Sequence, residues 1–207
     1  QILNEGKLGI AEEKCREFLK KHPTNTFAMS LLSEIADRLG YFDDAEFLLE
    51  SAVKLNPNDG ELRMKYAMIL RKKQKFSKTM EQVNILCKEF PTNLSYQAQK
   101  ASEIMQNGEH KEAIDLFDAI LRKNPYNFSI LTSKGHAQKT LGQTDLAIKS
   151  YQTAYNVKQD HGEAFFSLAN LKTYSFTKNE LNNMREQLKR VDLTLRDKVY
   201  FHFALAQ

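Results

Sequence analysis

The chain has 207 residues, of which 42% are hydrophobic and 27% charged, and its formal net charge is +4. This amount of apolar material can form a continuous core, which excludes a largely disordered chain. The small net charge is spread along the chain, so it gives no argument for a nucleic-acid partner. Since no stretch approaches the roughly eighteen apolar residues of a membrane span, we expect no membrane partner either.

Only two cysteines are present, Cys15 and Cys87, and each lies in an apolar helical pattern. Separate, packed thiols are typical of proteins that fold in a reducing compartment. The sequence shows no charged and then apolar leader. We therefore expect a cytoplasmic protein.

The dominant feature of the sequence is a period of 34 residues. All four prolines follow it, at Pro23, Pro57, Pro91 and Pro125. A glycine column contains Gly6, Gly40, Gly108 and Gly142, with Gln74 in its one gap. An alanine column contains Ala11, Ala45, Ala113 and Ala147, with Thr79 in its gap. Glycine supplies a left-handed helix cap and proline cannot continue a helix, so the columns predict a series of helix pairs.

Two further columns predict how the helices pack. Small residues recur at Ser33, Ala67, Ala101, Gly135 and Ala169, where they would let the first helix of a pair approach the second. Apolar residues recur at Cys15, Leu49, Val83, Phe117 and Tyr151, where neighbouring units would share a core. Both columns predict buried positions.

The combination of this period with glycine at the inner turn and proline at the end resembles the tetratricopeptide repeat (TPR). The resemblance implies an all-α fold, a right-handed superhelix (α-solenoid) of antiparallel helix pairs. The frame gives a truncated first repeat, with its second helix only, at residues 1–25. Full repeats follow at 26–59, 60–93, 94–127 and 128–161.

The end of the chain departs from this frame. We predict an atypical terminal helix pair at 162–192, whose first helix runs from Glu163 to Tyr174, and a C-terminal helix at 193–207 that leads toward a downstream domain. Terminal repeats are commonly atypical.

Capping signals set the starts of the last two helices. Thr177 and Glu180 form a capping box, flanked by Phe176 and Leu181 as a hydrophobic staple, so a helix should start at Thr177. Thr194 gives a weaker signal before a helix over residues 198–206.

Two motifs near the C-terminus are not generic repeat sequence: Ser-Leu-Ala-Asn-Leu-Lys-Thr at 167–173 and His-Phe-Ala-Leu at 202–205. In this order and spacing they resemble the junction of bacterial TPR-sulfotransferases, where a TPR array leads into an enzyme domain that uses 3′-phosphoadenylyl sulfate. The chain itself has no Pro-Arg-Ser-Gly-Thr phosphate loop. We therefore expect no cofactor here, and 3′-phosphoadenylyl sulfate only with a downstream sulfotransferase domain.

Other chemistry is not indicated. The histidines lie far apart and without metal-ligand spacing, at His22, His110, His136, His161 and His202. We predict no catalytic, cofactor-binding or metal-binding residue. The basic run at 71–78 would either meet an acidic partner surface or form a solvated turn.

Candidate partner-binding residues follow from the repeat frame, because the first helix of each TPR unit lines the concave surface. They lie at positions two, five, nine and twelve of each unit. The candidates are Phe27, Ser30, Glu34, Met64, Met68, Arg71, Ala98, Ser102, Met105, Thr132, His136, Lys139, Phe166 and Asn170. A trough rich in methionine and hydroxyl groups suits adaptable contact with a peptide or helix, and it equally suits plain exposure.

Two functional hypotheses remain open from the sequence. The first is a non-catalytic scaffold for protein–protein interaction that forms the N-terminal arm of a sulfotransferase-like enzyme. The second is a free-standing TPR adaptor that binds a peptide or helix in its concave groove. A half-repeat at 1–25 would leave apolar surface uncovered, so we also expect self-association.

Overall fold

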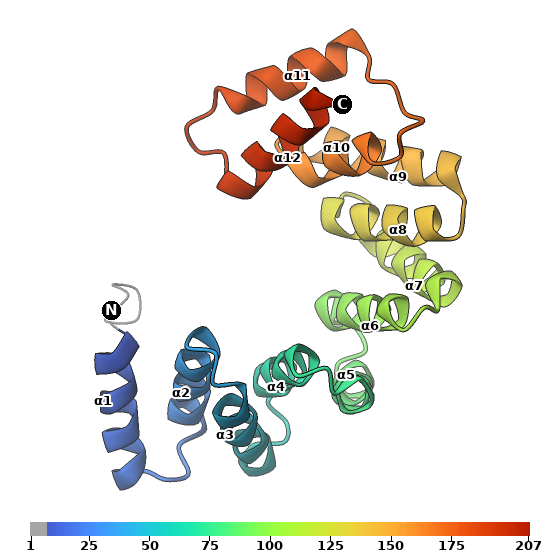
Figure 1. The fold of residues 1–207 in the computed structure, drawn as a ribbon. Helices are drawn as coiled ribbons and strands as arrows, with labels where there is room; N and C mark the ends of the chain where they lie inside the picture. Colours follow the sequence, from blue (N-terminus) through green and yellow to red (C-terminus); the bar gives the residue numbers. More distant parts are fainter. Residues whose placement is uncertain (1–7) are drawn as a thin grey trace. The chain divides into compact units, whose positions relative to one another are not determined.

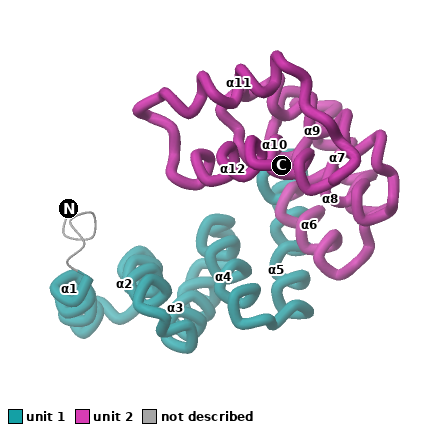
Figure 2. Tube along the Cα trace, turned by 45° about the horizontal axis from the view of Figure 1, so that its top comes forward, with its two compact units in different colours: residues 1–96 teal, residues 97–207 magenta. Residues whose placement is uncertain are grey.

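The computed structural model describes residues 8–207, and these residues form twelve α-helices and no strands (Figure 1). The predicted all-α fold is confirmed. The chain divides after residue 96 into two compact units, which Figure 2 shows in two colours. The glycine column's first member, Gly6, lies outside the described residues.

Unit 1 contains helices that pack in sequence order, α2 on α3 and α4 on α5. Its helices are α1 (Leu8–Lys21), α2 (Thr26–Arg38), α3 (Phe42–Leu55), α4 (Gly60–Lys72) and α5 (Phe76–Glu89). The division between the units falls within α6 (Leu94–Gln106).

Unit 2 continues the same pattern, with α8 packed on α9, and adds two closing helices. Its helices after α6 are α7 (His110–Lys123), α8 (Phe128–Thr140), α9 (Thr144–Val157), α10 (Gly162–Ala169), α11 (Lys178–Leu188) and α12 (Leu195–Ala206). We call the even-numbered helices first-type and the odd-numbered helices second-type, after their place in the predicted repeat.

Both helix types keep the 34-residue period. First-type helices start at residues 26, 60, 94, 128 and 162, and α12 starts one residue early, at 195. Second-type helices start at residues 8, 42, 76, 110, 144 and 178. The frame therefore persists through α11 and α12, although the turn glycine and the closing proline are missing there.

The predicted packing columns are buried. All five members of the small-residue column are buried, from Ser33 to Ala169. In the apolar column Leu49, Val83, Phe117 and Tyr151 are fully buried, while Cys15 is half-buried. The small column has a steric reason at Gly135, because a Cβ there would lie 2.5 Å from Cε1 of the Tyr151 ring. At Gly135 and Tyr151 the two columns meet within the pair of α8 and α9.

The inner turns use left-handed backbone, as the glycine column predicts. Gly40, Gly108 and Gly142 have φ of 82°, 92° and 74°. Gln74, which fills the gap in the column, has φ of 58°. The turn therefore keeps its conformation without glycine, at a steric cost to the side chain.

We expect Gln74→Gly to raise the free energy of unfolding by about 0.5–1 kcal/mol, because glycine adopts left-handed φ without that cost. Chemical denaturation followed by circular dichroism measures the change. The matched control is Gly142→Gln, which puts the same side chain into the same turn of another repeat and should be destabilising. A gain in stability from Gly142→Gln would contradict the argument.

The first helix of the last pair is shorter than predicted. We expected it to reach Tyr174, but α10 ends at Ala169, and the left-handed residue is Lys172, with φ of 59°. The reason is the packing of Phe176, whose ring lies 6.3 Å from that of the buried Phe165. Phe176 occupies the glycine position of the frame, and its contact with the core requires the chain to leave the helix early.

The capping box is confirmed. Thr177 Oγ1 accepts from the amide of Glu180 at 3.3 Å, and Glu180 Oε2 accepts from the amide of Thr177 at 2.8 Å. Glu180 Oε1 also accepts from the hydroxyls of Tyr155 at 2.7 Å and Tyr174 at 2.5 Å. Burial raises the pKa of Glu180, but these hydrogen bonds outweigh it and lower the pKa below its usual value. Burial, and then the bond to Glu180, raises the pKa of Tyr174 to about 12.

The C-terminal helix starts earlier than predicted and packs back onto the array. Thr194 caps α12 by accepting from the amide of Asp197 at 3.1 Å, so the helix begins at Leu195 rather than at 198. Phe201 and Ala204 lie in one buried cluster with Phe165 of α10 and with Met184 of α11. The predicted terminal segment 193–207 is therefore part of the folded end of unit 2.

Candidate protein-binding groove

Unit 1 contains a groove between the first-type helices α2 and α4. Lys65 Nζ donates to Ser30 Oγ at 2.9 Å, and Lys72 Nζ contacts Asp37 Oδ1 at 2.5 Å, so two contacts join the helices across it. One pocket of about 230 Å³ lies in the groove. It is lined by Ser33, Glu34, Asp37, Leu49, Lys65, Met68, Ile69 and Lys72. Leu49, Met68 and Ile69 give it apolar walls.

A second pocket of about 330 Å³ adjoins the first, and Glu34 and Lys65 line both. Its other lining residues are Thr26, Phe27, Ser30, Leu31, Asp59, Glu61 and Leu62. Asp59 is committed to capping α4, because its carboxylate accepts from the amides at 61 and 62. The two pockets thus share two lining residues, and the first has mainly apolar walls while the second is more polar.

Some charged side chains at the groove form ion pairs and others do not. Glu34 pairs with Arg38 at 2.8 Å, and Asp37 pairs with Lys72. Among the described residues, Lys65 has a hydroxyl partner in Ser30 and no carboxylate within ion-pair distance. The exposed ammonium of Lys65 is therefore available to an anionic group in the groove.

The sequence prediction found part of this lining. Four predicted residues line the pockets: Phe27, Ser30, Glu34 and Met68. Ser30 is buried, and its hydroxyl accepts from Lys65. The predicted residues Met64 and Arg71 line neither pocket; the guanidinium of Arg71 lies 5.0 Å from the ring centre of Phe76. Lys65 and Lys72 were missed. The repeat frame places positions five and twelve of the unit at the groove, and these are Met64 and Arg71, each one residue before the lysine that lines a pocket.

The basic run at 71–78 contacts acidic residues of its own chain. Lys73 pairs with Asp43 and Glu46, and Lys75 pairs with Glu46 at 2.6 Å. Burial raises the pKa of Glu46, but the hydrogen bonds from Lys73 and Lys75 outweigh it and lower that pKa. The run thus ties α3 to the turn after α4, and neither a free acidic-partner surface nor a merely solvated turn describes it.

Most of the predicted groove residues on α6 and α8 are less exposed to solvent than a binding surface would require. Ala98, Ser102 and Met105 of α6 are half-buried, while Lys139 of α8 is exposed. Thr132 is buried, because its hydroxyl donates to the carbonyl of residue 128 at 2.9 Å. We predicted Thr132 as a groove residue, but its hydroxyl is used inside the fold.

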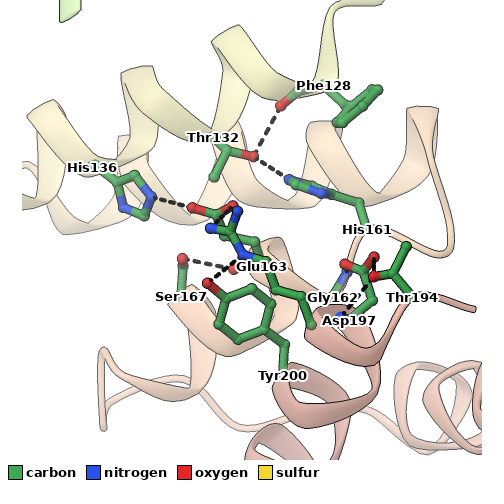
Figure 3. A network of polar contacts seen from close by, with 11 residues as sticks. Phe128, Thr132, His136, His161, Gly162, Glu163, Ser167, Thr194, Asp197 and Tyr200 are labelled. Carbon is green, nitrogen blue, oxygen red and sulfur yellow. Dashed lines mark hydrogen bonds and ion pairs between the residues drawn. The ribbon is translucent and has the colours of Figure 1, made fainter. Parts of the chain in front are cut away.

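Figure 3 shows the polar network that contains Thr132. Since the Thr132 hydrogen goes to a carbonyl, its oxygen accepts from Nε2 of His161 at 2.9 Å, which places a proton on that nitrogen. Burial lowers the pKa of His161. The ring is thus a structural link between α8 and the start of α10.

His136 lies in the same network, between a phenol and a carboxylate. Its Nδ1 is 3.0 Å from the Tyr151 hydroxyl, and its Nε2 is 3.5 Å from Glu163. Arg196 of α12 lies 3.3 Å from the other oxygen of Glu163. The contact with His136 lowers the pKa of Glu163, burial opposes this, and the charge of Arg196 adds to it. The predicted groove residue His136 therefore helps to hold α8, α10 and α12 together.

The last two predicted residues lie at α10. The Phe166 ring packs between Tyr200 and Phe203 of α12, at centroid distances of 4.8 and 4.7 Å. Asn170 is the C-cap of α10. The face of Phe166 that was predicted to meet a partner is therefore covered by α12.

The described residues contain no group of three or more His, Cys, Asp or Glu side chains arranged to hold a metal ion. Within the same part of the chain, no helix is long and apolar enough to cross a membrane.

Comparison with protein families decides the nature of the repeat. A family model described as the tetratricopeptide repeat matches residues 28–59 and 128–161. The chain contains tetratricopeptide repeats. The two matched TPR ranges lie in different units of the structure, and each covers one first-type and one second-type helix.

Solved structures share this TPR fold. The crystal structure of MamA has a TM-score of 0.68 at 18% identity, and the match covers 76% of this chain and 92% of that chain. YrrB has a TM-score of 0.66 at 14% identity, with 83% and 87% covered. A thermophilic TPR protein of Thermus thermophilus, TTC0263, has a TM-score of 0.65 at 22% identity, with 88% and 100% covered. No curated protein sequence matched. None of these matches bears on the sulfotransferase resemblance of the C-terminal motifs.

Proposed function

We propose that the chain is a non-catalytic TPR scaffold that holds a segment of a partner protein in the groove between α2 and α4. The observation that carries the proposal is the pair of adjoining pockets on first-type helices, with apolar walls at one end. A structural neighbour, YrrB, is described as a TPR protein with an unusual peptide-binding site. Concave helical surfaces commonly bind extended or helical segments.

The groove's lining indicates what the segment carries. Leu49, Met68 and Ile69 would surround one apolar side chain, and burial of such a side chain contributes about 1.5–3 kcal/mol. Lys65 would pair with a carboxylate beside it. Glu61 lines the second pocket and not the first. Its negative charge therefore repels an acidic residue of the ligand least when that residue lies near the first pocket. The preferred ligand is a segment with an apolar residue next to Asp or Glu.

The test is selection of peptides from a random display library against the full chain, followed by titration of the selected peptides. We expect sequences that place an apolar residue beside an acidic one. Met68→Glu and Lys65→Glu should each weaken binding at least about tenfold, which corresponds to about 1.4 kcal/mol.

The charge-matched control is Lys88→Glu, an exposed position on α5 that lines neither pocket. It should leave the affinity unchanged. Peptides that bind Met68→Glu as tightly as the unmodified chain would place the site elsewhere, and the absence of any selected peptide would overturn the proposal.

We also propose that the chain is the arm of a sulfotransferase-like enzyme. The supporting observation is that the two motifs of the resemblance belong to one packed unit, since Phe203 of the second contacts Phe166 beside the first. The parent protein, isolated and sequenced, is expected to continue past residue 207 into a phosphate-loop domain and to transfer sulfonate from 3′-phosphoadenylyl sulfate. A parent that ends near residue 207 would leave a free-standing adaptor. Both proposals place the protein in the cytoplasm, in keeping with its two free cysteines.

A further inference from the structure

A polar pocket of about 340 Å³ lies in unit 2 between α9 and α11, and the connection after α10 contributes to its lining. It is lined by Gln152, Tyr155, Asn156, Tyr174, Thr177, Asn179, Glu180 and Asn183. Four of these eight side chains are carboxamides, and the only charged one among them is that of Glu180. The pocket is therefore rich in hydrogen-bonding groups and poor in charge.

The carboxylate of Glu180 is already used inside the fold. Its Oε1 accepts from the hydroxyls of Tyr155 and Tyr174, and its Oε2 accepts from the amide of Thr177 at 2.8 Å and from its hydroxyl at 2.9 Å. A carboxylate offers about four lone-pair sites, and these four bonds fill them. The groups that remain for a ligand are the carboxamides.

The carboxamides keep hydrogen-bonding capacity. Among the residues that the structure describes, the side chains of Asn156 and Asn179 have no hydrogen-bond partner. The oxygen of Asn183 accepts from a neighbouring side chain of α11 at 3.2 Å, which leaves its two donor hydrogens. Gln152 donates to the Tyr174 hydroxyl at 3.0 Å, which leaves its oxygen. Because a carboxamide has both donors and an acceptor, it can bond to the N–H and the C=O of a peptide group.

The carboxamides also have the spacing that an extended chain requires. Asn179 and Asn183 lie four residues apart on α11, and Gln152 and Asn156 lie four residues apart on α9. Residues four apart share one face of a helix and are separated by about 6 Å along its axis. In an extended chain, peptide groups on one edge recur every second residue, about 6.7 Å apart. A segment that lies along either helix can therefore place a peptide group beside each carboxamide.

The equivalent place in unit 1 has a different lining. Three repeats earlier in the frame, the positions of three of the carboxamides are taken by Glu50, Lys54 and Glu81, which line a pocket of about 330 Å³ with other residues of α3, α4 and α5. There Lys54 pairs with Glu50 at 2.8 Å. The carboxamide lining is therefore not a general property of this place in the repeat.

We propose that the pocket of unit 2 is a second protein-binding site, at which the carboxamides of α9 and α11 hold an extended, uncharged segment of a partner protein by its main chain. Peptide groups bond to Asn179 and Asn183 along α11 and to Asn156 across the pocket. The site therefore tolerates many side chains, whereas the groove between α2 and α4 selects an apolar residue beside an acidic one. Since no residue lines both sites, the proposal does not depend on the groove.

The probe is a short, capped peptide in which threonine and alanine alternate. Threonine favours extended structure, and the peptide carries no acidic group for Lys65. The isotope-labelled full chain is titrated with the peptide, and NMR follows the side-chain amide signals. We expect the signals of Asn156, Asn179 and Asn183 to shift. The double variant Asn179→Ala/Asn183→Ala should bind at least about tenfold more weakly, because it loses two hydrogen-bonding side chains.

Two substitutions serve as controls. Asn182→Ala removes the same kind of side chain from an exposed position of α11 that does not line the pocket, and it should leave the affinity unchanged. Met68→Glu in the groove of unit 1 should also leave it unchanged, which separates this site from the groove. Alanine favours helix, and circular dichroism checks that the variants of α11 stay folded.

Modified peptides test whether the main chain is recognised. Two versions, N-methylated at alternate residues in one register or the other, each lose the donors of one edge, and at least one of them should no longer bind. Serine in place of threonine should leave binding intact. The proposal would be overturned by equal binding of both methylated peptides, by the absence of shifts at the three asparagines, or by an equal loss of affinity in Asn182→Ala.

Discussion

Phe165→Ala is expected to lower the free energy of unfolding by about 3–5 kcal/mol, the usual cost of removing a fully buried phenylalanine. Phe165 lies at the centre of the last helices of unit 2. Its ring stacks on Tyr155 at 4.5 Å and contacts Phe201 of α12 at 5.4 Å. The cavity left by alanine would therefore weaken the attachment of both α9 and α12 to α10. Urea denaturation followed by circular dichroism measures the loss.

The control for this prediction is Tyr126→Ala, which removes a large aromatic ring that is exposed in the same unit. It should change the free energy of unfolding by no more than about 0.5 kcal/mol. Equal effects of the two substitutions, or a loss below about 1 kcal/mol for Phe165→Ala, would show that the aromatic cluster does not hold the end of the array. Hydrogen exchange of α12 amides would then locate the actual contact.

Gly135→Ala is expected to destabilise the protein by about 1–2 kcal/mol, whereas the same substitution inside a helix normally stabilises a protein. Alanine would gain about 1 kcal/mol in helix propensity. Its Cβ, however, would lie 2.5–2.9 Å from three carbons of the fully buried Tyr151 ring. Overpacking of this kind typically costs about 1–3 kcal/mol, and the ring has little room to yield. Thermal or urea denaturation shows whether the free energy of unfolding falls or rises.

A second helical glycine supplies the matched control. Among the residues that the structure describes, no other atom lies within 4 Å of a Cβ added at Gly9 of α1. Gly9→Ala should therefore stabilise the protein slightly, by about 0.5 kcal/mol, because only the propensity term remains. Stabilisation by both substitutions would mean that Tyr151 moves freely, and the small-residue column would then lack its steric explanation.

The sequence predicted the helix starts well because their signals are local. A proline or a left-handed turn fixes where one helix ends, and a capping box such as that of Thr177 fixes where the next begins. Even Gln74 did not shift the frame, since the neighbouring repeat signals already determined the turn. The early end of α10 could not be predicted in this way, because it depends on Phe176 reaching a core that forms only in the folded chain.

The candidate groove was predicted less completely. Helical position alone places Ser30 and Thr132 on the concave side, but it does not say whether a hydroxyl faces solvent or bonds within the fold. Thr132 bonds a carbonyl in its own helix and receives a bond from His161, which lies 29 residues away in sequence. Lys65 was missed because the repeat frame places Met64 at the groove, whereas Lys65, the next residue, lines both pockets.

The regular 34-residue spacing of helix starts from α1 to α11 has a consequence for how such a chain can evolve. A duplicated or deleted block of 34 residues leaves every remaining helix with the same kind of neighbour, so no core has to be redesigned. The number of repeats can then change in single genetic events, while the residues that recognise a partner change by point substitution. Array length and binding preference are therefore open to selection separately.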